Sequence, residues 1–504
     1  MSKDTLLHLQ NGSDIRGFAL DTDIHNKNLT EESIQAIAVG LIKWWLSNHE
    51  YTLEKLTITI GHDSRITGPD IKEWLSEVFV GLGVDVIDVG LATTPALFMS
   101  TQYDEFSTDF GIMITASHLP MEYNGLKFFT NKGGLEHEDI ESILTFAEEN
   151  SGLSANAKGT VIQKDLISVY ANDLVSKIKK ALKSDDKDKP LEGRKILVDA
   201  GNGAGGFFAE KVLKPLGADT TGSQFLEPDG TFPNHEPNPD NKEAMASISE
   251  AVTKNEADLG IIFDTDVDRS AIVDKNGNSI NRNNLIGLIG SIVLEENPNS
   301  TIVTNSPVSD HLIHFIESLG GKVDRFISGY RNVINRGMDL NKEGIDCALA
   351  IETSGHAALR ENYFLDDGAY LAAKIITKEA ELSKDGKGVT DLIQTLKQPA
   401  ETKEIRFVIQ KEDYKERGID ILDLFEKWLG ETEGFEHVSD NLEGKRSQIN
   451  NPYGKGWLLL RMSLHEPKLV LQIENDFEGM IPLIEEKLKE FFYSFEDLDT
   501  SQLK

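Results

Sequence analysis

Three aspartates in the middle of the chain follow a buried-looking apolar run and carry the strongest chemical signal. The run Leu259 to Phe263 predicts a buried strand, and Asp264, Asp266 and Asp268 follow it at a spacing of two. Alternate side chains of an extended backbone face the same way, so these carboxylates are expected to converge. Converging negative charges need a cation, and hard oxygen ligands favour Mg²⁺ over softer metals. The segment therefore predicts a magnesium site.

Other interpretations of this acidic segment are weaker. A calcium-binding EF-hand loop needs glycine at its sixth position and glutamate at its twelfth, where this chain has Arg269 and Lys275. A solvent-facing acidic loop would not be expected directly after a buried strand. A phosphatase in which Asp264 is the nucleophile remains an alternative, because such enzymes use a D-x-D motif.

A serine beside a histidine forms the second signal. Ser117 and His118 follow a predicted strand over residues 112–115. A serine in this position could be a nucleophile or a phosphate carrier, and a helix-capping role is the alternative. The Asn124-Gly125 turn is expected to bring Lys127 back toward the same pocket, where a buried lysine could act as a base.

A third segment reads ETSGH. Its residues Glu352, Ser354 and His356 alternate and could therefore share a face. A carboxylate and a hydroxyl can bind sugar hydroxyls, and histidine can move protons near neutral pH. On this segment alone, an ordinary hydrogen-bonded loop is an equally good interpretation.

The fourth segment lies near the C-terminus between two strand-like runs. It places Arg461, Ser463 and His465 in one polar loop. Arginine combined with hydroxyl and backbone donors is a common way to bind phosphate. This segment alone does not separate that function from a plain turn.

A glycine-rich segment resembles a dinucleotide-binding motif. Gly201, Gly203 and Gly206 have G-x-G-x-x-G spacing after a predicted strand. The acidic residue that such a site needs would be Asp219, which lies in a weak strand. We interpret the glycines as a tight turn between strand and helix.

The elements that must position these residues repeat along the chain. Three segments, opening near residues 56, 194 and 301, each read as a strand, a polar turn, an amphipathic helix ended by Leu-Gly, and a second strand. Such units predict α/β layers with mainly parallel pairing, and the glycine suits a left-handed helix end. The last hundred residues predict a smaller α+β domain with two strands and a helix.

Length and charge exclude several functional classes. The chain has 504 residues, and 51 Lys+Arg against 84 Asp+Glu give a net charge of −33. This charge repels nucleic acid and anionic lipid, so neither is an expected partner. The single cysteine, Cys347, excludes a disulfide framework, and the apolar stretch Ile286 to Leu294 is too short to span a membrane. We expect a soluble cytoplasmic protein.

Taken together, the motifs TASHLP, DTDVDR, ETSGH and RMSLHEP, with SDIRG near the start, resemble the α-D-phosphohexomutase superfamily (phosphoglucomutase/phosphomannomutase). The resemblance covers essentially the whole chain. It implies three similar α/β domains with mixed sheets and a smaller C-terminal α+β domain around a central cleft. The expected boundaries are 1–158 with the phosphoserine loop, 159–297 with the metal loop, 298–398 with the sugar-recognition loop and 399–504 with the phosphate-binding loop.

The resemblance also implies a role for each candidate residue. Ser117 would carry a phosphoryl group and, with Asp264, Asp266 and Asp268, hold Mg²⁺. The residues expected to assist proton transfer are Lys127, Arg16 and His118. The residues expected to bind substrate are Arg269, Glu352, Ser354, His356, Gly329, Tyr330, Arg331, Arg461, Ser463 and His465.

The implied reaction interconverts hexose 1-phosphate and hexose 6-phosphate, with glucose 1,6-bisphosphate as intermediate and activator. Glucose or mannose phosphates are the expected substrates, and the protein is expected to be a monomer or homodimer. A phosphoglucosamine-type mutase, a magnesium-dependent phosphatase and a silent sugar-phosphate binder are the alternatives. Leu464, His465 and Gln472 depart from the commoner phosphate-binding pattern, which leaves the preferred hexose open.

Overall fold

The computed structural model describes residues 6–49, 56–149, 153, 158–183, 189–439, 441–463 and 466–503. The chain forms two compact units. The first comprises Met1–Asn281 and Ser354–Asp391, and the second comprises Arg282–Thr353 and Leu392–Lys504. No helix in the described ranges combines the length and the apolar character needed to cross a membrane.

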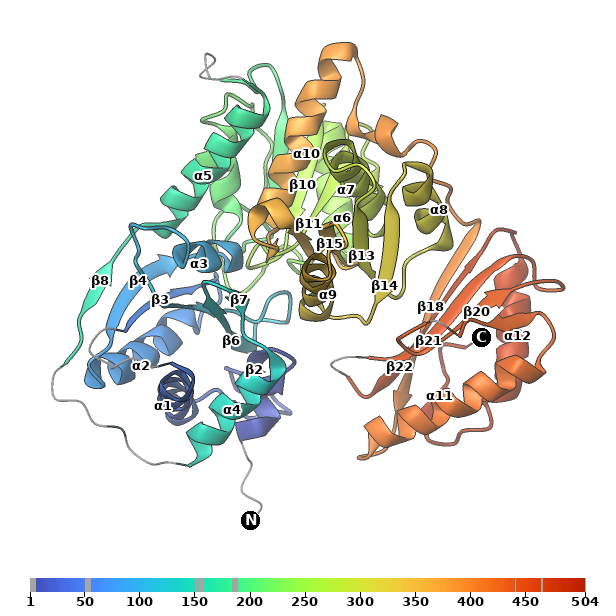
Figure 1. Ribbon diagram of the computed structural model, residues 1–504, viewed down its shortest axis with the longest axis horizontal. Helices are drawn as coiled ribbons and strands as arrows, with labels where there is room; N and C mark the ends of the chain where they lie inside the picture. The colour runs from blue at the N-terminus through green and yellow to red at the C-terminus, as the bar shows by residue number, and fades with distance from the viewer. Residues whose placement is uncertain are drawn as a thin grey trace. The chain divides into compact units, whose positions relative to one another are not determined.

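The first unit opens with a mixed eight-stranded sheet. Its order is β1-β2-β6-β5-β3-β4-β8, with β7 on β6, and β3 runs parallel to β4 and β5. The strands are β1 Gln10–Asn11, β2 Asp14–Phe18, β3 Thr57–His62, β4 Asp85–Leu91, β5 Phe110–Ile114, β6 Tyr123–Thr130, β7 Gly133–Gly134 and β8 Val161–Gln163. The helices are α1 Glu31–Asn48, α2 Gly68–Gly81, α3 Thr94–Ser100, α4 His137–Glu148 and α5 Leu166–Ala181. In Figure 1, α1, α2 and α4 lie on one face of this sheet, and α3 and α5 lie on the other.

Local sequence explains where these helices begin. The Thr30 side chain accepts a hydrogen bond from the Ser33 amide and completes a capping box at the start of α1. Ile34, Ile37 and Leu41, at helical spacing, are buried in the core that α1 shares with α2, α4 and the sheet. This core covers the face of the sheet opposite α3. The loops that follow β3 and β5 are polar and lie at the ends of these strands.

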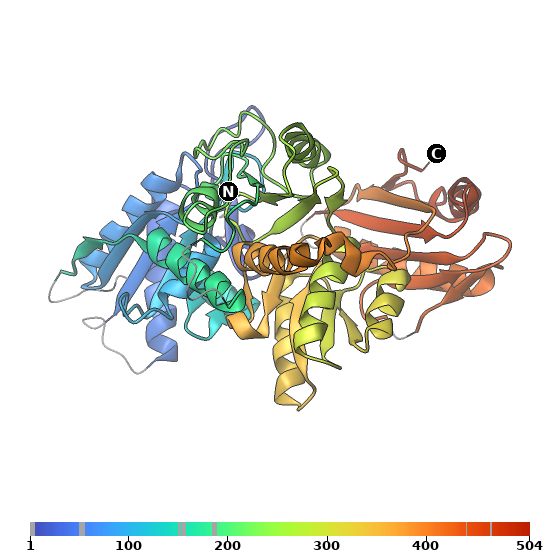
Figure 2. The same ribbon diagram turned by 90° about the horizontal axis from the view of Figure 1, so that it is seen from above.

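A second mixed sheet follows in the same unit. Its order is β12-β11-β10-β9, and only the pair β9–β10 is parallel among its described strands. The elements are β9 Ile196–Asp199, a π-helix Phe208–Leu213, α6 Lys242–Lys254, β10 Leu259–Phe263, β11 Ser270–Asp274 and β12 Ser279–Ile280. The hairpin of β16 Ala357–Leu359 and β17 Leu365–Asp366 and the helix α10 Gly368–Leu382 complete the unit. Helix α10 packs beside α5, as Figure 2 shows.

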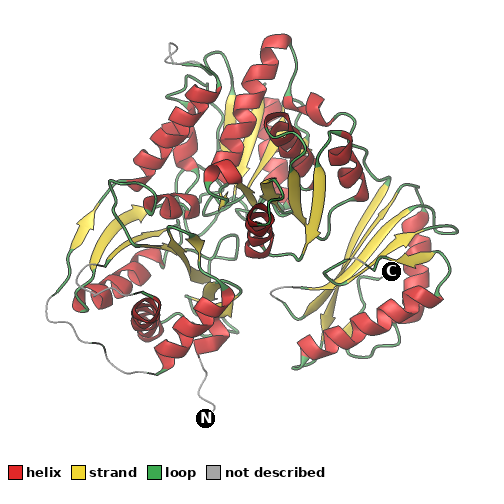
Figure 3. Cartoon of the chain, viewed as in Figure 1, coloured by secondary structure: helices red, strands yellow, loops and turns green. Residues whose placement is uncertain are grey.

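The second unit contains a parallel sheet and an antiparallel one. In the first, β13 Thr301–Asn305 lies between β14 Lys322–Phe326 and β15 Cys347–Ile351, with α7 Asn283–Glu296, α8 Asp310–Ser318 and α9 Tyr330–Lys342. The second has the order β19-β20-β21-β22-β18-β23. Its strands are β18 Glu401–Ile409, β19 Phe435–His437, β20 Lys445–Ile449, β21 Gly456–Met462, β22 Lys468–Asn475 and β23 Leu498–Asp499. Helices α11 Tyr414–Glu431 and α12 Met480–Phe492 share one core with it (Figure 3).

The predicted fold class is confirmed: three α/β regions precede a C-terminal antiparallel sheet with two helices. The glycines that end the repeated helical segments, Gly83, Gly217 and Gly320, all have positive φ angles, at 80°, 91° and 85°. One expected helix is different. The segment after the glycine-rich turn forms only the short π-helix Phe208–Leu213, because Pro215 follows it at once and cannot continue a helix.

Candidate active site

The three aspartates after β10 converge in the first unit. Asp264, Asp266 and Asp268 are buried, and their carboxylate oxygens lie within 4.8 Å of one another. Between them, Val267 has a φ of 66°, a strained conformation for a β-branched residue. The loop therefore turns tightly enough to bring alternate carboxylates to one point.

Ser117 meets this acidic loop. It lies in the turn after β5, is buried, and has a φ of 52°. Its hydroxyl donates to Asp264 Oδ2 at 3.1 Å, accepts from Arg269 at 3.1 Å, and lies 3.3 Å from His118 Nδ1. The two strongest sequence motifs thus form one site.

A buried arginine that the sequence analysis did not single out shapes the Ser117 turn. The Arg65 guanidinium donates to the carbonyls of Ser117, Leu119, Pro120 and Tyr123 at 2.5–2.9 Å. These four carbonyls span the whole turn, so one rigid cation holds its shape. The available signal was the charged DSR sequence directly after the buried strand β3.

An aspartate next to Arg65 links that arginine to the serine. Asp63 lies 3.3 Å from Arg65 Nε and accepts a 2.6 Å bond from the Thr115 hydroxyl. Thr115 Oγ1 in turn accepts from the Ser117 amide at 2.9 Å. The strand ends of β3 and β5 are therefore joined by a buried hydrogen-bonded chain.

Two cations face the acidic loop. Lys127, on β6, contacts Asp268 closely and lies 3.2 Å from Asp266 Oδ2, in the acidic loop that Ser117 also contacts. Arg269 donates from Nε to Asp264 Oδ2 at 3.0 Å. These positive charges offset part of the buried negative charge.

Arg16 and His118 border the same site. Arg16 lies on β2, opposite Gly125 of β6, and its guanidinium donates to Asp14 at 2.9 Å. Burial, followed by the charges of Arg269 and Arg16, holds the pKa of His118 well below its ordinary value. These effects disfavour the positively charged imidazolium form of His118.

His356 joins the acidic loop from the ETSGH segment. Its Nδ1 lies 2.5 Å from Asp366 Oδ2 and 3.9 Å from Asp268 Oδ1. Burial opposes its charge, but Asp366 and Asp268 raise the pKa of His356 to about 9. An imidazolium is thus held beside the carboxylates, while Ser354 lies two residues away at intermediate exposure.

The electrostatics of the acidic loop fit a divalent cation. Burial and the neighbouring Asp268 charge raise the pKa of Asp264 well above its usual range. The oxygens Asp266 Oδ1 and Asp268 Oδ1 are buried without a hydrogen-bond donor among the described residues. Buried carboxylate oxygens of this kind are normally satisfied by donors or by a metal ion. The buried aspartate cluster is consistent with a metal site.

The glycine-rich turn after β9 packs against the acidic loop. The Ala204 amide donates to the Thr265 carbonyl at 2.8 Å. A Cβ on Gly203 would lie 2.7 Å from that carbonyl oxygen, and a Cβ on Gly206 would lie 2.2 Å from the Leu226 carbonyl oxygen. The glycines are needed because protein backbone packs against them, as the tight-turn interpretation predicts.

The remaining candidates lie in the second unit. Gly329 has a φ of 116° and caps α9, which begins with Tyr330 and Arg331, and its amide donates to Glu352 Oε1 at 2.7 Å. Arg461 lies at the end of β21, 3.8 Å from Glu443. The Ser463 amide closes the following hairpin by donating to Lys468 O at 2.8 Å. Leu464 and His465 lie outside the described residues.

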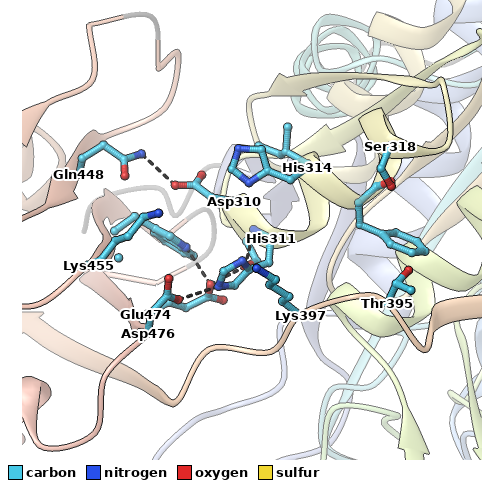
Figure 4. A pocket seen from close by; sticks show the side chains of 15 residues that line it. Asp310, His311, His314, Ser318, Thr395, Lys397, Gln448, Lys455, Glu474 and Asp476 are labelled. Atoms are coloured by element: carbon cyan, nitrogen blue, oxygen red, sulfur yellow. Dashed lines mark hydrogen bonds and ion pairs between the residues drawn. The ribbon is translucent and has the colours of Figure 1, made fainter.

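The second unit also contains a cavity of about 690 Å³ that the sequence did not predict. It lies between α8 and the strands β20 to β22, and none of the candidate residues lines it (Figure 4). Polar bonds cross beside it, including Gln448 to Asp310 at 2.8 Å and His311 to Asp476 at 2.6 Å. The cavity therefore lies along the contact between the parallel and antiparallel sheets.

Comparison with known proteins places the chain in a family. Residues 8–152, 169–277 and 281–399 match the phosphoglucomutase/phosphomannomutase alpha/beta/alpha domains I, II and III. A phosphoglucomutase of Neisseria meningitidis is 31% identical over 86% of this chain and 87% of its own length. A phosphomannomutase/phosphoglucomutase of Pseudomonas aeruginosa is 32% identical over 84% of each chain.

A solved structure shares the fold over nearly the full length. The phosphoglucomutase/phosphomannomutase family protein of Burkholderia thailandensis superposes with a TM-score of 0.77 at 24% identity, covering 96% of each chain. The sequence matches and the shared fold agree with the motifs that form the site. The chain is an enzyme of the phosphoglucomutase/phosphomannomutase family, within the α-D-phosphohexomutase superfamily.

Proposed function

We propose that this enzyme is an intramolecular phosphotransferase that interconverts hexose 1-phosphate and hexose 6-phosphate, with glucose or mannose phosphates as substrates. Ser117 would carry the phosphoryl group, and a 1,6-bisphosphohexose would be the intermediate and activator. The observation that carries this proposal is the position of the Ser117 hydroxyl, 3.1 Å from both Asp264 and Arg269. The names of the two sequence relatives support both sugars.

The acidic loop provides the ligands for the proposed cofactor. Asp264, Asp266 and Asp268, together with an oxygen of phosphorylated Ser117, would hold Mg²⁺. When bound, this ion neutralises phosphate charge and stabilises the charge that shifts during phosphoryl transfer. The buried oxygens without hydrogen-bond donors among the described residues support this assignment.

Phosphoryl transfer requires a proton to move in each half-reaction. In the first, a sugar hydroxyl attacks the phosphorus, the bond from phosphorus to Ser117 Oγ breaks, and the hydroxyl proton is released. In the second, Ser117 Oγ attacks the other phosphate of the bisphosphate and loses its proton, the bond from that phosphorus to the sugar oxygen breaks, and the sugar oxygen takes up a proton. His118 Nδ1, 3.3 Å from Ser117 Oγ, is placed to exchange the serine proton. Lys127 would serve the sugar hydroxyl, with Arg16 assisting.

Substrate recognition would be divided between two groups of residues. Glu352, Ser354 and His356 would bind sugar hydroxyls, and the loop that begins at Gly329, with Tyr330 and Arg331, would also bind substrate. Arg269 would contact the phosphoserine. Arg461 and Ser463, followed by His465, would bind the phosphate that does not react. Because the bisphosphate must present either end to Ser117, this distal site has to accept a phosphate on either carbon.

The phosphatase alternative is disfavoured by the contacts of Asp264. A carboxylate nucleophile needs an oxygen that is free to attack phosphorus, whereas Asp264 Oδ1 accepts a hydrogen bond from the Arg269 amide at 3.1 Å. Asp264 also already accepts hydrogen bonds from Ser117 and Arg269. These contacts suit a supporting carboxylate better than an attacking one.

The direct experiment measures turnover and phosphorylation together. The protein with Mg²⁺ is given glucose 1-phosphate and a trace of glucose 1,6-bisphosphate, with mannose and glucosamine 1-phosphates in parallel reactions. We expect 6-phosphates to form and mass spectrometry to find phosphate on Ser117. Release of free phosphate by Ser117→Ala but not by Asp264→Asn would instead identify a phosphatase. Absence of 6-phosphate from all three sugars would refute the proposal.

A further inference from the structure

A glutamate of the antiparallel sheet domain binds the edge of the parallel sheet in the second unit. Glu443 Oε2 accepts hydrogen bonds from the Ser306 hydroxyl, from the Ser328 hydroxyl at 2.6 Å and from the Ser328 amide at 3.1 Å. Ser306 follows β13 and Ser328 follows β14. The carboxyl ends of parallel strands meet at one edge, which is where ligands bind in α/β sheets. Glu443 thus occupies a typical ligand position.

The backbone around Glu443 directs its carboxylate toward these donors. Gly444, directly after Glu443, has a φ of 63°, and a Cβ there would lie 2.2 Å from the Leu460 carbonyl oxygen. Only glycine allows this turn, which brings the chain tightly over β21. The Asn441 side chain also donates to the Glu443 carbonyl. The turn at Gly444 and the Asn441 hydrogen bond therefore fix the position of Glu443.

The groups around the carboxylate are those that bind phosphate. Two serine hydroxyls and one amide next to the N-terminus of α9 donate to it, and the Arg461 guanidinium lies 3.8 Å from its other oxygen. Hydroxyls, helix N-terminal amides and arginine form the usual phosphate-binding set. Arg461 Nε is buried without a hydrogen-bond acceptor among the described residues. The site therefore has a hydrogen-bond donor, Arg461 Nε, that the Glu443 carboxylate does not use.

Other contacts already hold the two sheets of this unit together. Arg446 is fully buried, stacks on Trp457, and donates to the Ser306 and Val308 carbonyls and to Asp310 at 2.8–3.2 Å. The bonds in Figure 4, such as His311 to Asp476, add to this contact. The Glu443 carboxylate can therefore leave its donors without separating the sheets.

We propose that Glu443 is an internal anion that occupies phosphate-binding donors in the ligand-free enzyme and is displaced by the phosphate of the sugar phosphate. By occupying these donors, Glu443 lowers the affinity of the enzyme for phosphate. Only ligands that compete successfully with its carboxylate for the donors can bind. This inference rests on the proposed function, because that function assigns Arg461 to the distal phosphate. The ligand class is a phosphate monoester dianion, which carries more charge and more acceptor oxygens than a carboxylate.

Calorimetric binding of inorganic phosphate and of glucose 6-phosphate tests this proposal without requiring turnover. Wild type, Glu443→Gln and Glu443→Ala are compared. We expect Kd to fall by about tenfold in the alanine variant, equivalent to about 1.4 kcal/mol, and by less in the glutamine variant, which retains an acceptor. In turnover assays, KM should fall while kcat changes little. Glu490→Gln, which removes one charge from the exposed face of α12, is the matched control and should leave Kd unchanged.

The outcomes separate this inference from the proposed function. An unchanged or higher Kd for phosphate in both Glu443 variants, with melting temperatures near that of wild type, overturns the inference even if the wild type is an active mutase. Tighter phosphate binding by the variants of an inactive wild type would support the internal anion and refute the mutase proposal. Failure of wild type and both variants to bind either ligand would also overturn the inference. The isosteric glutamine variant keeps the test decisive if the alanine variant does not fold.

Discussion

The hydroxyl of Ser117 donates a 3.1 Å hydrogen bond to Asp264, a residue 147 positions further along the chain. The two side chains come from loops that follow strands of different sheets. Ser117 itself has a φ of 52°, and Val267, three residues after Asp264, has a φ of 66°. Strain of this kind persists only where the surrounding contacts hold it, and it is concentrated at functional sites. The Ser117–Asp264 contact is therefore the structural centre of the proposed chemistry.

Ser117→Ala removes the proposed phosphate carrier without adding volume. We expect mutase activity to fall by about a thousandfold or more, because the variant lacks the proposed nucleophile. The melting temperature should stay within a few degrees of wild type, since the hydroxyl makes few contacts. Coupled detection of 6-phosphate and thermal unfolding measure the two effects. Substantial activity in this variant would contradict the assignment of Ser117.

Mg²⁺ should stabilise the folded protein through the acidic loop. A ligand at a hundred times its Kd contributes about 2.7 kcal/mol to the free energy of unfolding, so the melting temperature should rise when Mg²⁺ is added. Asp266→Asn should abolish this rise because it removes one ligand charge, while Asp385→Asn, at the exposed end of a short 3-10 helix, should not. Calorimetric titration with Mg²⁺ checks binding without turnover. An equal thermal shift in both variants would place the ion elsewhere.

Arg65→Lys should damage the Ser117 turn. Lysine cannot reach the four carbonyls that the planar guanidinium binds, and it would leave Asp63 poorly paired in a buried site. Breaking a buried charged pair costs about 3 kcal/mol or more. Denaturant unfolding should show this loss together with a fall in kcat. Arg336→Lys, in a partly exposed pair with Asp324, is the control and should cost less than about 1 kcal/mol.

The contrast between Arg65 and the aspartates shows what the sequence could reveal. Spacing of two after an apolar run predicts that Asp264, Asp266 and Asp268 converge on an extended backbone, but they meet in the tight turn around Val267 and not within a strand. Arg65 reaches Ser117 across 52 positions, and Glu443 reaches Ser328 across 115, through contacts that depend on how separate strands are ordered in a sheet. Local spacing carries no such information.

His235 should make stability depend on pH. Burial alone would lower the pKa of His235, but its hydrogen bonds with Asp199 at 3.0 and 3.1 Å raise it. A raised folded-state pKa gives stability that is complete below the ordinary value, about 6.5, and is lost as pH rises through the folded pKa. The stability difference between wild type and His235→Gln should therefore shrink as pH rises above that value. A difference that is constant with pH, measured by denaturant unfolding, would mean that His235 stays neutral.

Gly203→Ala tests whether the glycine-rich turn supports the metal loop. The added Cβ would lie 2.7 Å from the Thr265 carbonyl oxygen, between Asp264 and Asp266, so the loop must shift. Overpacking of this kind costs about 1–3 kcal/mol, and Mg²⁺ should bind more weakly because the carboxylates move apart. Gly81→Ala is the matched control: a Cβ there meets nothing within 4 Å at the end of α2. A variant at Gly203 that loses stability but keeps its Mg²⁺ affinity would show that the turn holds the sheet and not the acidic loop.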